Sequence, residues 1–255
     1  MLLRAGSLIP LALAAAFAAG AARAQGIPIA RPVVVELFTS QGCSSCPPAD
    51  SLLSELIQDH PKLIALTLPV DYWDYIGWKD TLASPAFTAR QKAYAAMRGD
   101  HQVYTPQAVV NGLSHVVGSD RAELEVAASA AFGKQGALSV ALSTRPDDWN
   151  LLVEAGAAPQ GAPREGAFWI FQIARERKVT IGRGENSGHT VTYSNVVRRM
   201  LKVRDWTGEP VRFAIPRDSL VSPETDGWVL LLQAGSEGRP GAILAAATGA
   251  GAHMR

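Results

Sequence analysis

The chain contains only two cysteines in 255 residues, Cys43 and Cys46, and two serines separate them. A small exported protein stabilised by disulfides would have several spaced cysteines. A bridge across so short a loop removes little conformational entropy from the unfolded chain, so it would add little stability. Reactivity therefore explains the pair better than stabilisation of the fold, with an inert bridge or half of a metal site as the alternatives.

The sequence also lacks an excess of charge of either sign. Lys and Arg number 24, Asp and Glu number 23, and no basic run occurs. Nucleic acids and anionic membranes attract proteins through clustered positive charge, so neither is expected as a partner. Composition is 47% hydrophobic and 18% charged, which indicates a globular protein with a substantial core.

Long apolar runs are missing except near the N-terminus, between Leu8 and Ala19. Arg4 precedes this run, and Ala22-Arg23-Ala24 follows it with the small-x-small pattern that signal peptidase accepts. The run is interrupted by Pro10 and is shorter than the ~20 residues of a membrane-spanning helix. We therefore expect residues 1–24 to be a signal peptide cleaved near Ala24. The mature protein would be periplasmic or secreted, without a stable membrane anchor, and its oligomeric state is left open.

Residues 27–133 have the alternating strand and helix patterns of an α/β domain. The predicted order is strand, helix, strand, helix, strand, strand, helix. Asn111-Gly112 lies between two apolar runs, which is a strong signal for a hairpin turn. The predicted strands are 33–38, 63–70, 103–110 and 113–117. The predicted helices are one that carries its apolar face over 49–57 and stops at Asp59-His60-Pro61, one over 81–97 and one over 121–132.

From about Leu138 the pattern changes to many short apolar segments separated by Gly, Pro and Asp clusters. Residues 138–250 are therefore expected to form a mainly antiparallel, sandwich-like β domain. The glycine-rich segment 182–188 is expected to be a hairpin loop, because a strand pattern and no helix follows it. The predicted strands are 138–142, 149–154, 167–174, 179–182, 189–193, 211–215, 228–233 and 242–247.

The two cysteines lie between a predicted buried strand and a predicted helix. A thiolate is the attacking species in thiol chemistry, and the N-terminus of a helix favours it. A second thiol can then attack the mixed disulfide, so Cys43 is predicted to be a solvent-reachable nucleophile and Cys46 the resolving thiol. Proline is tolerated only in the first helical turn. Pro47-Pro48 therefore predict a helix that begins at Ser44 or Ser45.

Several other residues are candidates for the same site. Thr105-Pro106 precedes a strand expected beside the dithiol, and a cis proline there would expose backbone to an extended substrate. Glu36 is either buried and able to relay a proton to Cys46, or solvated on an edge strand. Tyr72, Trp73 and Trp78 either line a peptide-binding groove or pack their loop onto the core.

A metal or cofactor is not expected. Copper could be held by both thiolates together with His101 or His115, but no ligand spacing supports such a site. Ordinary packed or surface histidines explain these positions better.

The segment Val35 to Asp50, VELFTSQGCSSCPPAD, resembles the signature of a secreted bacterial family catalogued as domain of unknown function 1223. The likeness continues through DYWD, GWKD, YTPQ and GENSG, which are residues 71–74, 77–80, 104–107 and 184–188. The order of elements, the cysteine pair and Thr105-Pro106 also resemble the thioredoxin superfamily. These resemblances imply export and a thioredoxin-like N-terminal domain, with superfamily roles at Cys43, Cys46, Pro106 and Glu36. The Ser-Ser pair, the double proline and Gly42 in place of a tryptophan depart from the superfamily pattern.

Three hypotheses follow from the sequence. The first is an exported thiol-disulfide oxidoreductase that uses Cys43 and Cys46 on protein thiols or disulfides. The second is a periplasmic copper- or metal-binding protein, and the third is a non-catalytic thioredoxin-like interaction module.

Overall fold

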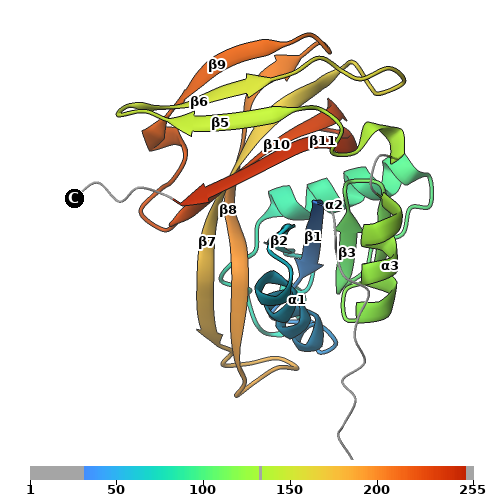
Figure 1. The fold of residues 1–255 in the computed structure, drawn as a ribbon. Coiled ribbons are helices and arrows are strands. Elements are labelled where there is room, and N and C mark those ends of the chain that lie inside the picture. Colours follow the sequence, from blue (N-terminus) through green and yellow to red (C-terminus); the bar gives the residue numbers. More distant parts are fainter. Residues whose placement is uncertain (1–31, 132–133, 251–255) are drawn as a thin grey trace, which may run out of the picture.

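The structure is a computed structural model that describes residues 32–131 and 134–250, so the predicted signal peptide lies outside the described residues. The first half alternates strands and helices in the order expected from the sequence (Figure 1). Among the described residues, no helix is long and apolar enough to cross a bilayer. The elements are β1 (Val33–Thr39), α1 (Pro47–Asp59), β2 (Leu63–Pro69), the 3-10 helix η1 (Asp74–Ile76), α2 (Pro85–Arg98), β3 (Gln107–Val110), β4 (Ser114–Val117) and α3 (Arg121–Ala131).

The second half consists almost entirely of antiparallel strands, as expected, but its strands are longer than predicted. β7 is continuous where two short strands are expected, and β8 runs well past Tyr193. The charged ends of β7 and β8 face solvent, so apolar segments in the sequence do not mark the full length of these two strands. The elements are η2 (Lys134–Gly136), β5 (Leu142–Pro146), β6 (Asn150–Ala155), β7 (Gly166–Thr180), β8 (Thr190–Trp206), β9 (Val211–Pro216), η3 (Arg217–Ser219), β10 (Gly227–Ser236) and β11 (Arg239–Ala250).

One large sheet runs through both halves of the chain in the order β11-β10-β7-β8-β2-β1-β3-β4. It is mostly antiparallel, with β1 parallel to β2 and β2 parallel to β8. Within this sheet the strands of the two halves are joined by a single backbone pair, Thr67 of β2 with Val196 of β8. The Thr67 hydroxyl donates to the Ser194 carbonyl at 2.6 Å, and the Asn195 carboxamide donates to the Ala65 carbonyl at 3.0 Å. Side chains therefore supplement the short backbone ladder between β2 and β8.

Alternation along β1 sends its side chains to opposite faces of the sheet. Val35 and Leu37 pack with α1 and α3, whereas Val34 and Phe38 pack with the Phe87 and Tyr94 side chains of α2. A separate sheet, β5-β6-β9, covers one face of β7, β10 and β11 and forms a second core with them (Figure 1). The large sheet crosses from residues 27–133 into residues 138–250, so the boundary between these two segments stays a prediction.

The predicted turn after β3 is confirmed, and α2 begins at Pro85, inside the predicted range 81–97. Ser84 caps α2, its hydroxyl accepting from the backbone N–H of Ala86, and Pro85 occupies the first helical position. Asn111 and Gly112 both have positive φ, 48° and 72°, as the tight turn requires. The strand expected at 138–142 is wrong, since Leu138 has a φ of 52° and β5 begins only at Leu142.

Gly112→Ala is expected to destabilise the fold far more than Gly99→Ala. Both glycines have positive φ, so each substitution costs about 1 kcal/mol of backbone strain. A Cβ at Gly112 would also lie 2.5 Å from the Gly241 carbonyl oxygen, whereas one at Gly99 meets nothing within 4 Å. We expect Gly112→Ala to lose about 2 kcal/mol more free energy of unfolding, measured by denaturant titration. Equal losses would contradict this packing.

Candidate functional site

The two cysteines form a disulfide in the turn between β1 and α1. The Cys43 N–H donates to the Ser40 carbonyl at 3.2 Å, and the Cys46 N–H donates to the Cys43 carbonyl at 3.1 Å. The helix begins at Pro47 with Cys46 as its N-cap, later than the predicted start at Ser44 or Ser45. The physical reason is that Pro47-Pro48 lack N–H groups and fit the first two positions, while residues 43–46 form a separate turn. The helix N-terminus therefore lies at Cys46 and not at Cys43.

The expectation that Cys43 is solvent-reachable is wrong for this conformation. Cys43 is 1% exposed and Cys46 is 0% exposed. The loop between β7 and β8, residues 181–189, reaches the turn that carries the disulfide from the second half of the chain. Its Asn186 is buried and donates one hydrogen bond to the Gln41 carbonyl and another to the Cys43 carbonyl, both at 2.9 Å. The segment predicted to be a hairpin loop thus covers the cysteine pair.

Residues 71–80 form the second part of this cover. A Cβ added at Gly42 would lie 3.1 Å from the Trp73 Cβ and 3.1 Å from the Ile76 Cδ1, so this segment lies directly on the turn before Cys43. The Trp78 ring packs against Gly182 in the hairpin loop, and its indole N–H donates to the Gln41 carboxamide oxygen at 2.8 Å. Trp78 therefore belongs to the packed cover and not to the wall of an open groove.

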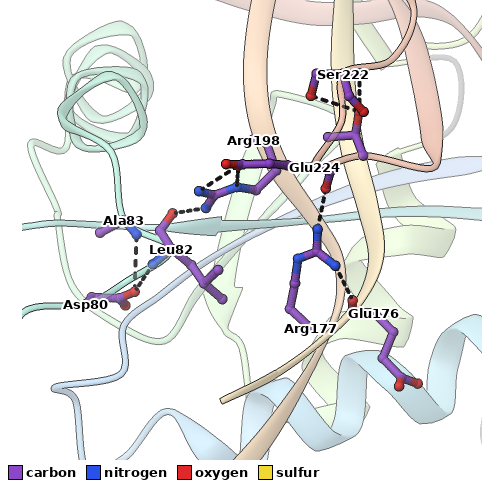
Figure 2. Close-up of polar contacts among 9 residues, drawn as sticks. Asp80, Leu82, Ala83, Glu176, Arg177, Arg198, Ser222 and Glu224 are labelled. Carbon is purple, nitrogen blue, oxygen red and sulfur yellow. Dashed lines mark hydrogen bonds and ion pairs between the residues drawn. The ribbon is translucent and has the colours of Figure 1, made fainter. Parts of the chain in front are cut away.

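Asp80 lies at the end of residues 71–80 and connects this segment to the turn before Cys43. Its carboxylate accepts the backbone N–H groups of Gln41 at 2.8 Å, Leu82 at 2.8 Å and Ala83 at 3.1 Å. Figure 2 shows the next link, in which the Arg198 guanidinium donates to the Leu82 carbonyl at 3.0 Å and pairs with Glu224. Burial raises the pKa of Asp80, and these backbone hydrogen bonds oppose that rise. Asp80 is thus a structural anchor.

Thr105 and Pro106 lie beside the site, as predicted, and the bond between them is cis. The Trp73 indole donates to the Thr105 hydroxyl at 2.8 Å. A Cβ added at Gly118 would lie 3.2 Å from the Pro106 Cβ and 3.3 Å from the Ala49 Cβ, so Pro106 is close to the first turn of α1.

Tyr72 is half-buried beside Trp73, with their ring centroids 6.4 Å apart. Burial raises the pKa of the Tyr72 hydroxyl. Of the predicted substrate-binding residues, Tyr72, Trp73 and Thr105 therefore lie together near the turn that carries the cysteines.

Glu36 is buried, but its carboxylate is hydrogen-bonded to two side chains of α2. It faces α2, on the side of the sheet opposite Leu37 and α1. Arg90 donates to its Oε1 at 2.7 Å, and the Tyr94 hydroxyl donates to its Oε2. The Arg90 guanidinium also donates to the Gln233 carboxamide of β10 at 2.9 Å, which joins three elements in one network. The proposed proton relay from Glu36 to Cys46 is therefore wrong, because strand alternation points Glu36 away from α1.

The structure adds two residues that the search of the sequence missed, Ser45 and Asp50. The Ser45 hydroxyl lies 3.4 Å from the Cys43 sulfur, and the Ser45 residue is exposed. Asp50 is 3% exposed on the buried face of α1, four residues after Cys46. Helical spacing of four residues places it on the same face as Cys46, a signal that the sequence does contain.

Burial is the main influence on the Asp50 carboxyl. It raises the pKa of Asp50 well above the ordinary value, the nearby Thr39 hydroxyl lowers it, and repulsion from Asp80 raises it. Neither carboxyl oxygen has a hydrogen-bond partner of good geometry among the described residues. A buried carboxyl without partners favours its neutral form.

A histidine does not join the cysteines. Within residues 32–131 and 134–250, no three His, Cys, Asp or Glu side chains are grouped so that they could hold a metal ion. His115 contacts the Tyr104 hydroxyl at 2.8 Å and Asp100 at 3.1 Å, and His101 is exposed. The described geometry therefore offers no ligand set for the copper hypothesis.

Comparisons with known proteins place this site in a wider group. Residues 34–233 match the model of the family described as "Protein of unknown function (DUF1223)". A protein from Agrobacterium tumefaciens with a known crystal structure is 33% identical, with a TM-score of 0.75 over 91% of this chain and 98% of its own. HBP35 of Porphyromonas gingivalis is 12% identical, with a TM-score of 0.54 over 86% of this chain and 74% of its own, which is a likeness of fold alone. No curated protein matches the chain.

Asp50→Asn is expected to stabilise the protein at alkaline pH. Because the folded-state pKa of Asp50 is raised, the wild type loses stability as pH rises from the ordinary pKa, about 3.9, through the raised pKa. The neutral amide avoids that loss, so the variant should melt about 3 °C or more above wild type at pH 8. Well below the ordinary pKa of about 3.9 the carboxyl is protonated in both states and the gain should vanish. The exposed Asp59→Asn on the same helix is the control, and a lower melting temperature for Asp50→Asn at pH 8 would contradict the assignment.

Asn186→Ala is expected to speed reduction of the disulfide by a small phosphine. The substitution removes two buried hydrogen bonds that hold the cover, each worth about 1 kcal/mol or more. The reduction rate should rise about tenfold or more, measured by labelling the released thiols. Ser187→Ala removes only an exposed hydrogen bond of the same loop and should leave the rate near wild type. Equal rates for all three proteins would show that this cover does not limit access.

Proposed function

The chain belongs to the DUF1223 family of proteins of unknown function, and we propose that it is a thiol-disulfide exchange protein with Cys43 and Cys46 as its redox pair. The observation that carries this proposal is the disulfide between a buried strand and the N-terminus of α1, with Trp73 linking its turn to Thr105. A disulfide that closes so short a loop removes little conformational entropy from the unfolded chain and adds little stability. Reactivity of the two sulfurs therefore explains the pair better than stabilisation of the fold.

Cys43 is the sulfur that a substrate would attack. The exposed Ser45 hydroxyl lies over it, whereas Cys46 caps α1 and is fully buried. Attack on Cys43 would leave Cys46 as the departing sulfur at the helix N-terminus, where the helix dipole favours an anion. In the reverse direction Cys46 would resolve the mixed disulfide.

We further propose that residues 32–131 form a thioredoxin-like unit. This is supported by the order β1-α1-β2-α2-β3-β4-α3, by the central position of β1 between parallel β2 and antiparallel β3, and by Pro106 next to the first turn of α1. The β-rich second half would then supply the loop that gates the cysteines.

The cover implies that exchange requires movement. Protein substrates would reach Cys43 only after the Asn186 loop or the Trp73 segment moves, which restricts reaction to partners that stabilise the open form. Tyr72, Trp73 and Thr105 would contact such a partner, since they lie beside the turn that carries Cys43.

Export is part of the proposal and rests on residues 1–24 alone. Their charged start, apolar run and Ala22-Arg23-Ala24 pattern support cleavage near Ala24 and a periplasmic or secreted protein. Such compartments permit disulfide chemistry, which agrees with the proposed activity.

One observation favours a second candidate function, that of a non-catalytic interaction module. Both cysteines are almost completely buried, which is typical of an inert bridge. In that case the disulfide would resist thiol reagents in the folded protein, and its removal would change only stability.

The matched variants Cys46→Ser and Cys43→Ser separate these functions. We expect Cys46→Ser to form a lasting mixed disulfide with glutathione disulfide through Cys43, at least about tenfold faster than Cys43→Ser does through Cys46. Mass spectrometry of the folded proteins measures both rates. The exchange function would be overturned if neither variant reacts while folded and wild-type disulfide resists dithiothreitol below the unfolding temperature.

A further inference from the structure

The Asp50 carboxyl differs from the Asp80 and Glu36 carboxyls near the site: the Thr39 hydroxyl beside it lowers its pKa, but no charged group or backbone N–H among the described residues donates to it. Asp80 accepts three backbone N–H groups, and Glu36 is bound by Arg90 and Tyr94. Both Asp50 oxygens are inaccessible to solvent and lack a hydrogen-bond partner of good geometry among the described residues. A buried polar group in this condition is costly and requires an explanation.

The position of Asp50 supplies the explanation. Its backbone N–H donates to the Cys46 carbonyl at 3.1 Å, and the four-residue spacing stacks its side chain over the same helix face as Cys46. The next position on this face, Ser54, contacts the Ser194 hydroxyl of β8 at 2.8 Å, so the face lies between α1 and β8. The buried Asp50 carboxyl and the buried Cys46 sulfur therefore lie one helical turn apart on the same face.

We propose that Asp50 is the proton donor to Cys46 when the disulfide opens, an inference that rests on the proposed exchange function. A substrate thiolate attacks the Cys43 sulfur and forms a new S–S bond with it. The bond between Cys43 and Cys46 breaks and leaves its electron pair on Cys46, which takes the proton of the Asp50 carboxyl. The products are a mixed disulfide on Cys43, a Cys46 thiol and an Asp50 carboxylate.

The groups that face Asp50 make it suited to this step. Thr39 at the end of β1 and Tyr193 of β8 are uncharged neighbours, and Asp80 repels a negative charge on it. Burial raises the pKa of Asp50, so the carboxyl still holds its proton where an exposed aspartate would have lost it. Burial raises the pKa of Tyr193 well above its ordinary value, with Asp50 and Asp80 adding to the rise, so its hydroxyl is a poor proton donor.

The test is the pH dependence of disulfide opening by excess dithiothreitol in the full oxidised chain. The rate is measured by acid quench and thiol labelling between pH 5 and 9, divided by the dithiothreitol thiolate concentration, for wild type, Asp50→Asn and Asp59→Asn. The same series on the Asn186→Ala background shows whether loop opening limits the rate. We expect the wild-type rate to fall as pH rises through the Asp50 pKa. Asp50→Asn should be at least about tenfold slower at the acid end, with no inflection, because an amide cannot release a proton.

The outcomes distinguish the inference from the function on which it rests. Asp59→Asn should retain the wild-type profile, because its side chain is exposed. If wild type opens and Asp50→Asn shows the same rate and inflection, the role of Asp50 is overturned while exchange stands. If the disulfide of the folded protein opens neither in the wild type nor in Asn186→Ala, both proposals are overturned. A uniform loss in Asp50→Asn that preserves the inflection would indicate a structural effect and would also overturn the proton transfer.

Discussion

The two hydrogen bonds that Asn186 donates to the carbonyls of Gln41 and Cys43 are the constraint on which the site depends. They connect a loop of the β-rich half to the turn that carries the cysteines, across 143 residues of sequence. The loop reaches this turn because β8 is held beside β2 by one backbone pair and by the side chains of Thr67 and Asn195. Without that alignment Asn186 would not reach the turn that carries the disulfide.

Closure over the cysteines also creates the electrostatic conditions around them. Removing water from the turn raises the pKa of Asp50 and leaves its carboxyl in an environment where charge is unfavourable. Burial therefore favours the neutral form of the Asp50 carboxyl, one helical turn from Cys46.

The buried acidic residues Glu36 and Asp50 show two different uses of a carboxyl group. Glu36 is stabilised by Arg90 and Tyr94, and it ties β1 to α2 and, through Gln233, to β10. A fully bonded ion pair of this kind fixes the packing of three elements. Asp50 has no such partner, although its burial is almost as complete. Removing Arg90 would leave the buried Glu36 carboxylate with an uncompensated charge. Replacing Asp50 by a neutral residue would instead remove a group whose charged form is unfavourable.

The sequence by itself determined the local features: the order of elements from β1 to α3, the Asn111-Gly112 turn, the Ser84 cap and the position of the cysteines before a helix. Each depends on residues within a few positions of one another, where alternation, capping and turn preferences act directly. Only the tertiary structure decided which groups surround the disulfide. The face on which Glu36 lies, the lid carrying Asn186 and the continuity of β7 and β8 depend on contacts between residues far apart in the chain. Local preference contains no information about those contacts, because the free energy that selects them is gained only when distant surfaces exclude water together.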